Sequence, residues 1–198
     1  SEKSPVGQCF VYHTYIDMLI KLLRDLKACH QLRKSHAHIK GDNILLDKTG
    51  AAFLHDFGCG FDFNISTLEA FLKKGALGAL LYQSPELILM PEDASLQSEQ
   101  NILGADIWAL GMVFARALDL ETPSQKAHEK RKGQGELLML LQLKKNMRKI
   151  IAGDKSLSLN TLFKPHSKMQ ADLVKFIMTF MISSVDNRCR TLGTFDSQ

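Results

Sequence analysis

Two short stretches of the sequence gather side chains suited to proton transfer and cation binding. The first is His36–Asn43, with the sequence HAHIKGDN, and the second is DFG, which begins at Asp56, thirteen residues after Asn43. A neutral imidazole can accept a proton. The two stretches also carry amide and carboxylate oxygens, which are hard ligands for cations. These residue types make 36–58 the candidate site.

Three further signatures follow in order along the chain. They are GALLYQSPE at 78–86, DIWALG at 106–111, and an arginine at position 188 beyond the last apolar helix. Together with the first two stretches, they resemble the protein kinase family. In that resemblance HAHIKGDN is the catalytic loop, DFG is the magnesium-binding triplet, and 78–86 is the end of the activation segment.

The resemblance implies a role for each polar residue of the catalytic loop. His38 takes the position of the aspartate that accepts or orients the proton of the substrate hydroxyl. Lys40 would neutralise charge on the transferred phosphate, and Asn43 with Asp56 would hold magnesium. Leu45 would lie at the nucleotide cleft. The implied cofactors are therefore Mg²⁺ and ATP, with His38 and Lys40 as the catalytic residues.

The same resemblance assigns structural roles to six residues: His36, Phe57, Gly58, Glu86, Asp106 and Arg188. His36 would be buried, pack under Phe57 and hydrogen-bond nearby backbone. Asp106 would hydrogen-bond the backbone of the catalytic loop. Glu86 and Arg188 would form a partly buried ion pair that fixes the end of the activation segment.

One position of the catalytic loop bears on regulation. Ala37 stands where many kinases carry an arginine that pairs with a phosphorylated activation segment. Phosphorylation at Ser66 or Thr67 therefore has no obvious receiver. A loop residue other than arginine, followed by Gly41 near the asparagine, is similar to kinases of the MAP3K type such as the NF-kappa-B-inducing kinase.

Zinc binding is the alternative interpretation of the histidines. His36, His38 and His55 could converge near Asp56 and offer imidazole and carboxylate ligands. However, the resemblance places His36 in the core, and three histidines in a loop region are more often separate residues than a site.

A helix and a hairpin are expected to position the candidate site. Four leucines recur at i, i+3, i+4 and i+7 and predict an amphipathic helix that ends near His30: Leu19, Leu22, Leu23 and Leu26. Two apolar runs, 44–46 and 52–54, flank DKTG and predict a short hairpin that turns on Gly50. The second strand of this hairpin would place Asp56 just past its end.

Two more helices are expected in the second half of the chain. Residues 102–118 are apolar almost all round and include Trp108, which predicts a helix buried in the middle of the domain. Leu173, Phe176, Ile177 and Phe180 repeat the amphipathic spacing and predict a last long helix. Polar residues and turn formers predict a loop over 122–135.

The composition of the chain indicates the number of domains, the type of partner and the cellular compartment. A chain of 198 residues that is 45% hydrophobic and 23% charged suits one compact domain. The net charge is only +4, and the small basic cluster at 126–132 is typical of a solvated loop rather than a nucleic-acid patch. Four cysteines without CxxC spacing indicate a reducing compartment: Cys9, Cys29, Cys59 and Cys189. No apolar run approaches a bilayer span, so we expect a cytoplasmic protein.

The sequence therefore predicts a mainly α fold over residues 1–198: a kinase C-terminal lobe, built as a helical bundle around a buried central helix with a short β-hairpin by the catalytic-like loop. No GxGxxG and no VAIK-like strand occurs in it, so the N-terminal lobe is expected to be absent. The apolar roof of the cleft around Ile44, Leu45 and Leu46 would be covered by that lobe or by another protein.

Two functions remain open on this basis. The favoured one is a pseudokinase or inactive kinase fragment that acts through protein contacts, because His38 brings no negative charge. The alternative is a serine/threonine kinase that transfers the γ-phosphate of ATP to a protein hydroxyl, with its N-terminal lobe outside this sequence. The choice of serine/threonine over tyrosine rests on Lys40, two residues after His38.

Overall fold

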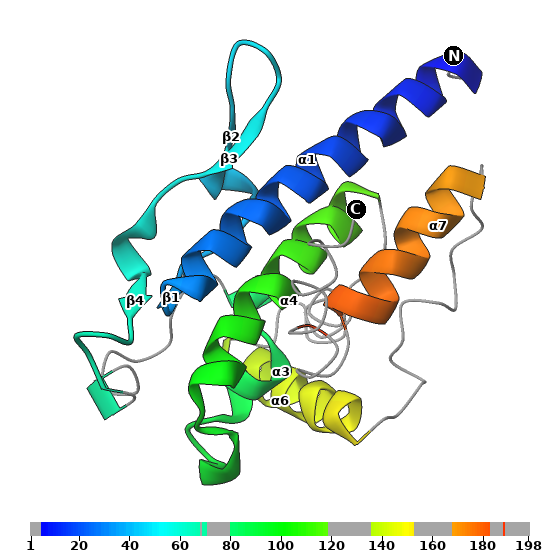
Figure 1. Cartoon of the computed structure of the whole chain (residues 1–198). Coiled ribbons are helices and arrows are strands. Elements are labelled where there is room, and N and C mark those ends of the chain that lie inside the picture. Colours follow the sequence, from blue (N-terminus) through cyan, green and yellow to red (C-terminus); the bar gives the residue numbers. More distant parts are fainter. Residues whose placement is uncertain are drawn as a thin grey trace.

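The computed structural model describes residues 5–67, 69–70, 80–118, 136–152, 168–182 and 188. The loop predicted over 122–135 and the glycine at position 78 lie outside these residues. The described part is rich in helices, with two small antiparallel sheets of two strands each (Figure 1).

The first helix is long and contacts most of the other elements. Helix α1 spans Pro5–Gln31, and the four leucines that predicted it are all buried. It contacts strand β3 as well as helices α4 and α7, so it lies between the hairpin and the other helices (Figure 1). The predicted end near His30 is confirmed within one residue.

The central buried helix is α4, which spans Glu99–Ala117. It begins three residues earlier than predicted because Ser98 caps it, accepting a hydrogen bond from the backbone of Asn101. Twelve of its residues are buried and lie around the whole circumference, including Trp108 at 0% exposure. The sequence-based expectation of a helix buried on all sides is confirmed.

The last predicted helix changes its geometry near its end. Helix α7 spans Lys168–Phe176, and the chain then forms a π-helical turn, η7, over Ile177–Met181. The backbone N–H of Ile182 donates to the carbonyl of Ile177, five residues back. Met181 in this turn packs against Gly111 of α4, where a Cβ atom at 111 would lie 2.8 Å from the Cβ of Met181. The glycine allows this close approach. The predicted last helix is present, and its end has π rather than α geometry.

The strands are short and belong to two ladders. Strands β2 (Ile44–Leu46) and β3 (Ala52–Leu54) form the predicted hairpin, with Leu45 opposite Phe53. Gly50 adopts a φ of 85° in its turn, a conformation that favours glycine. Strands β1 (Lys34–Ser35) and β4 (Phe61–Asp62) form a second ladder that the sequence pattern did not predict.

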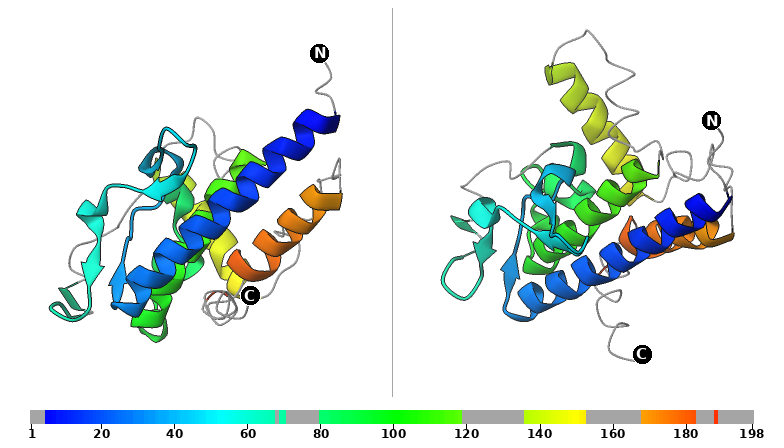
Figure 2. Two further views of the ribbon diagram at one scale, coloured as in Figure 1. Left: turned by 45° about the horizontal axis from the view of Figure 1, so that its top comes forward. Right: turned by 90° about the horizontal axis from the view of Figure 1, so that it is seen from above.

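Two further helices pack below α4. Helix α3 spans Pro85–Leu89 and is capped by Ser84, whose hydroxyl accepts a hydrogen bond from Leu87 N. Helix α6 spans Glu136–Ile151, contacts α3, and points away from α1 and α7 when the molecule is seen from above (Figure 2). Buried side chains join α3 to α6, including Ile88, Leu143 and Met147. The sequence pattern did not predict α6.

Candidate active site

The turn after α1 and the short β1–β4 ladder position the candidate loop beside the DFG segment. The helix ends when Leu32 N donates to the carbonyls of Ala28 and Cys29, and Arg33 then takes a left-handed conformation with a φ of 55°. Strand β1 follows and pairs with β4, so that Ser35 lies opposite Phe61. This ladder brings the segments 36–43 and 56–60 side by side.

Asp106 of α4 holds the loop from below. Its carboxylate is 2% exposed and accepts hydrogen bonds from His36 N at 2.9 Å and Ala37 N at 2.8 Å. Ala37 has a φ of 57°, a left-handed conformation that costs a non-glycine residue about 1–2 kcal/mol. The predicted hydrogen bonds from Asp106 to the loop backbone are confirmed, and they offset this strain.

The carboxylate of Asp106 has a third partner, which the sequence pattern did not indicate. The Nε2 atom of His30, at the end of α1, lies 3.0 Å from Asp106 Oδ2, and both side chains are at least nine-tenths buried. The two residues are 76 positions apart, so only the fold brings them together. His30 therefore links the end of α1 to the same carboxylate that shapes the loop.

His36 lies where the resemblance implied. Its side chain is fully buried, its ring centroid is 4.3 Å from that of Phe57, and its Nε2 lies 3.0 Å from the backbone oxygen of His55. Its Nδ1 atom accepts a hydrogen bond from His38 N at 3.3 Å. Burial lowers the pKa of His36 below its ordinary value of 6.5, more than the nearby Asp106 raises it.

This lowered pKa predicts a loss of stability on mild acidification. The unfolded chain binds a proton at His36 below about pH 6.5, while the folded chain resists it, so folding stability falls as the pH drops below that value. We expect the melting temperature to fall between pH 7.5 and 5.5, and to fall less in a His36→Asn variant. Thermal unfolding at several pH values measures the change of melting temperature with pH in both proteins. An equal slope in both proteins would contradict the assignment, and a His13→Asn variant, changed at an exposed site, serves as the control.

The imidazole of His38 faces the carboxylate of Asp56. Its Nδ1 lies 3.3 Å from Asp56 Oδ2, and the side chains are 20% and 44% exposed. Asp56 itself adopts a left-handed conformation with a φ of 64° and accepts a hydrogen bond from Gly58 N. This hydrogen bond, together with the neighbouring imidazoles of His38 and His55, lowers the pKa of Asp56, so the carboxylate is charged at neutral pH.

Three further candidate site residues lie on the loop or on the strand that follows it. Asn43 is buried, and its amide nitrogen donates to His38 O at 2.8 Å, which leaves the amide oxygen as the group for a cation. Lys40 lies 3.5 Å from the exposed carboxylate of Asp42. Leu45, on β2, is 38% exposed. The hard oxygen donors of Asn43 and Asp56 fit a divalent cation such as Mg²⁺.

The predicted ion pair between Glu86 and Arg188 is present. Arg188 is fully buried and donates to Glu86 Oε1 at 2.5 Å and to Gly104 O at 3.1 Å. Its guanidinium carbon lies 5.4 Å from the ring centroid of Trp108, within the range of a cation–π contact. The pair therefore ties the start of α3 to the middle of α4.

Comparison with known proteins places this geometry in a family. The family model described as "Protein kinase domain" matches residues 7–194, which is nearly the whole chain. The chain belongs to the protein kinase family. The model spans both the loop around His38 and the buried Arg188, so the site described above lies within the matched region of this kinase chain.

Two relatives illustrate how far the kinase similarity extends. The chain is 32% identical over 133 residues to "Serine/threonine-protein kinase SKS1" of Saccharomyces cerevisiae, which covers 61% of this chain and 25% of that protein. It is 33% identical over 99 residues to "Cell division control protein 2 homolog 2" of Trypanosoma brucei brucei, which covers 50% of this chain and 26% of that protein. The matches thus span about a quarter of the length of these curated relatives.

Family membership has general consequences for this kinase chain. Protein kinases as a family use ATP with Mg²⁺ and act on protein substrates. The amide oxygen of Asn43 and the carboxylate of Asp56 are oxygen donors of the type that such a cation takes. The set of three histidines considered for zinc does not form, because His36 is buried and already bonded to the backbone of His55.

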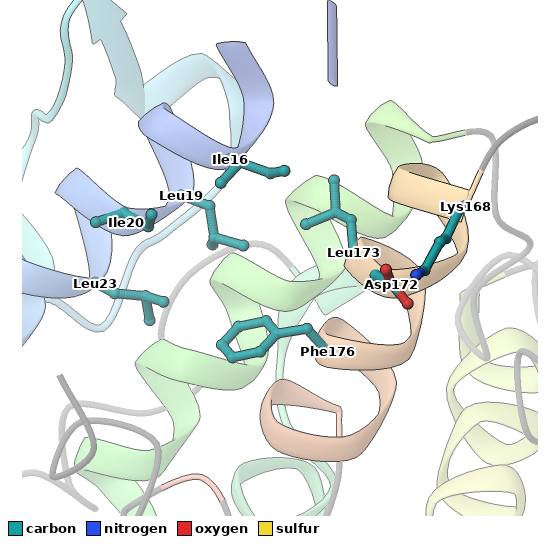
Figure 3. Close-up of a pocket in the computed structure, with 8 residues that line it drawn as sticks. All are labelled: Ile16, Leu19, Ile20, Leu23, Lys168, Asp172, Leu173 and Phe176. Atoms are coloured by element: carbon teal, nitrogen blue, oxygen red, sulfur yellow. The ribbon is translucent and has the colours of Figure 1, made fainter. Parts of the chain in front are cut away.

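A separate apolar cavity of about 600 Å³ lies between α1 and α7 of the kinase chain (Figure 3). Leu19, Leu173 and Phe176 point into it, and the charged ends of Lys168 and Asp172 lie at its border. None of the candidate catalytic residues lines this cavity.

Among the described residues, no helix of the kinase chain is both long and apolar enough to span a bilayer.

Proposed function

We propose that residues 1–198 form the C-terminal lobe of a pseudokinase, a kinase-like domain with little or no phosphotransfer that acts through contacts with other proteins. The observation that carries this proposal is the side chain of His38. Its imidazole faces Asp56 from the loop position at which the family motif has an aspartate. The proposal therefore concerns the exchange at the proton-accepting position of the loop.

The exchange removes a charge from the reaction centre. Phosphoryl transfer depends on positioning and on electrostatic stabilisation, and the aspartate orients the attacking hydroxyl. A neutral imidazole accepts a proton but carries no negative charge. Asp42 offers no replacement, because its carboxylate is 86% exposed and lies beside Lys40. We infer that the loop retains its shape and loses most of its catalytic power.

Exposed apolar residues on the hairpin support a role in protein contacts. Leu45, Leu46 and Phe53 are 38%, 56% and 37% exposed, and all three lie on β2 or β3 beside the loop. In the family this region borders the nucleotide cleft. We propose that an N-terminal lobe or another protein covers it, and that Asn43 and Asp56 hold Mg²⁺ with ATP beneath that cover.

A serine/threonine kinase is the second candidate. Lys40, Asn43 and Asp56 are all retained, and the name of the yeast relative is that of a serine/threonine kinase. In this case His38 would serve as a weak proton acceptor. A cytoplasmic location agrees with the scattered cysteines, and similarity to MAP3K kinases through Ala37 and Gly41 stays a prediction.

Restoring the aspartate tests the proposal. In the whole protein that carries this chain, we expect His38→Asp to raise phosphotransfer at least about 100-fold, the contribution of a positioned proton acceptor. The measurement is ATP-dependent phosphorylation of a generic protein substrate. A His38→Asn variant changes the side chain without adding a charge and should stay inactive. Robust and equal turnover by the wild type and His38→Asp would reject the pseudokinase assignment in favour of the kinase.

A further inference from the structure

The apolar cavity between α1 and α7 has a buried floor and a border that reaches the surface. Three buried leucines form the floor: Leu19, Leu23 and Leu173. Three partly buried side chains complete the apolar lining: Ile16, Ile20 and Phe176. The volume of about 600 Å³ lies within the range of about 300–1,000 Å³ that is typical of small-molecule sites. The cavity is therefore deep enough and large enough to hold a ligand.

The shape of the cavity favours a chain-like ligand. It follows one face of α1 from Ile16 to Leu23, a length of about 10 Å at 1.5 Å per residue, and runs beside α7 (Figure 3). The two helices are in contact with each other. A third helix with its side chains is about 10–12 Å across, so it does not fit between them. An extended alkyl chain is thin, needs no hydrogen-bond partner and gains from leaving water.

Two unpaired charges lie at the border of the cavity. Lys168 and Asp172 are four residues apart on α7, so they lie on the same side of that helix, with Cβ atoms about 5–6 Å apart. Both side chains are exposed, and neither has an ion-pair or hydrogen-bond partner among the described residues. A lysine four positions before an acidic residue is the less favourable order for a pair within a helix. The border therefore offers a separate cation and a separate anion.

We propose that this cavity binds a single-chain amphiphile with a zwitterionic head group, the chemical class that includes the lysophospholipids. The alkyl chain lies between α1 and α7, the anionic part of the head group faces Lys168, and the cationic part faces Asp172. A head group with one charge would pair with one of these residues and meet a like charge at the other. The inference goes beyond the proposed function, because no residue of the catalytic-like loop takes part.

Calorimetry on the whole protein that carries this chain tests the choice of head group. The probe is dodecylphosphocholine, used as a monomer below its micelle concentration. Dodecanoate, dodecyltrimethylammonium and dodecyl maltoside carry the same chain with an anionic, a cationic and an uncharged head group. We expect dodecylphosphocholine to bind about three to ten times more tightly than each of them, because two exposed charge pairs each contribute modestly.

Single charge removals sharpen this test. In Lys168→Ala the remaining Asp172 should make the alkylammonium the better of the two singly charged amphiphiles, and in Asp172→Ala the remaining Lys168 should favour the carboxylate. Lys175→Ala removes an exposed charge from α7 outside the lining of the cavity, and it should leave the order of the four affinities unchanged.

Filling the cavity tests where the chain binds. Ile16→Trp places a larger side chain in the lining, and we expect it to weaken the binding of all four amphiphiles at least about tenfold. Thermal unfolding checks that the variant is folded. Ile16→Phe, a smaller increase in volume, should weaken binding in the same direction and serves if Ile16→Trp does not fold. Arg24→Trp adds the same ring at an exposed position of α1 outside the lining and should change nothing.

Three results would overturn the inference. The first is equal affinity of the wild type for all four amphiphiles, and the second is unchanged binding in a folded Ile16 variant. The third is binding to vesicles of dioleoylphosphatidylcholine as tight as binding to the monomeric probe, which would indicate recognition of a membrane surface. If no amphiphile binds and Ile16→Trp instead abolishes self-association in analytical ultracentrifugation, the cavity is a protein contact and the inference also fails.

Discussion

Replacement of Glu86 by alanine is expected to lower the free energy of unfolding by about 3 to 5 kcal/mol, because it leaves a charged guanidinium buried without its partner. Arg188 is fully buried, and its contact with Glu86 is the anionic one among the described residues. The remaining contacts, to Gly104 O and the ring of Trp108, do not neutralise the charge. Chemical denaturation monitored by the fluorescence of Trp108 measures the change.

A paired variant separates the stranded charge from general damage to the core. Replacing both residues, as in Glu86→Leu with Arg188→Met, removes the two charges together and is expected to recover most of the stability lost by Glu86→Ala. If the double variant is as unstable as Glu86→Ala, the loss of stability at this position comes from altered packing rather than from an unpaired charge. Glu92, which pairs with Lys144 and Arg148 near the surface, provides a matched control, and its replacement should cost far less.

The Asp106→Ala variant is expected to lose about 2 to 6 kcal/mol of stability, because it leaves one buried and one partly buried backbone N–H group without an acceptor, at about 1–3 kcal/mol each. These groups belong to His36 and Ala37, and the strained conformation of Ala37 depends on them. The loss should therefore appear both in the unfolding free energy and in the local structure of the loop. Thermal unfolding, combined with NMR chemical shifts of residues 36–43, measures both.

The control for this variant is an exposed aspartate. Asp25 pairs with Lys21 on the surface of α1, and Asp25→Ala should change stability by less than about 1 kcal/mol. Asp106→Asn keeps one acceptor oxygen and should fall between Asp25→Ala and Asp106→Ala. If Asp106→Ala unfolds like the wild type and leaves the loop signals unmoved, the carboxylate does not hold the loop.

Local patterns in the sequence were enough to predict the elements whose signals lie within one segment. The leucine spacing of α1, the apolar runs around Gly50 and the continuous apolar stretch of α4 each specify their structure through near neighbours. The Asp106 hydrogen bonds and the Glu86–Arg188 pair were predicted from the order of motifs, not from periodicity. They are confirmed because the fold of the family places them together.

What the sequence did not predict depends on contacts between distant segments. Strands β1 and β4 are two residues long, and their pairing joins positions that are 26 to 28 residues apart. Helix α6 was missed because polar residues such as Gln142 share its buried face, which blurs the apolar stripe. The π-helical turn after α7 accompanies close packing against Gly111, which periodicity does not reveal.

The left-handed backbone at Ala37 has a consequence for anyone who wants to borrow this loop. A peptide with the sequence of residues 36–43 would relax away from that conformation, since the carboxylate that bends it belongs to a helix some 70 positions further along the chain. A graft of the loop into another scaffold must therefore bring the acidic residue of α4 with it. The minimal transferable unit is the loop together with that helix.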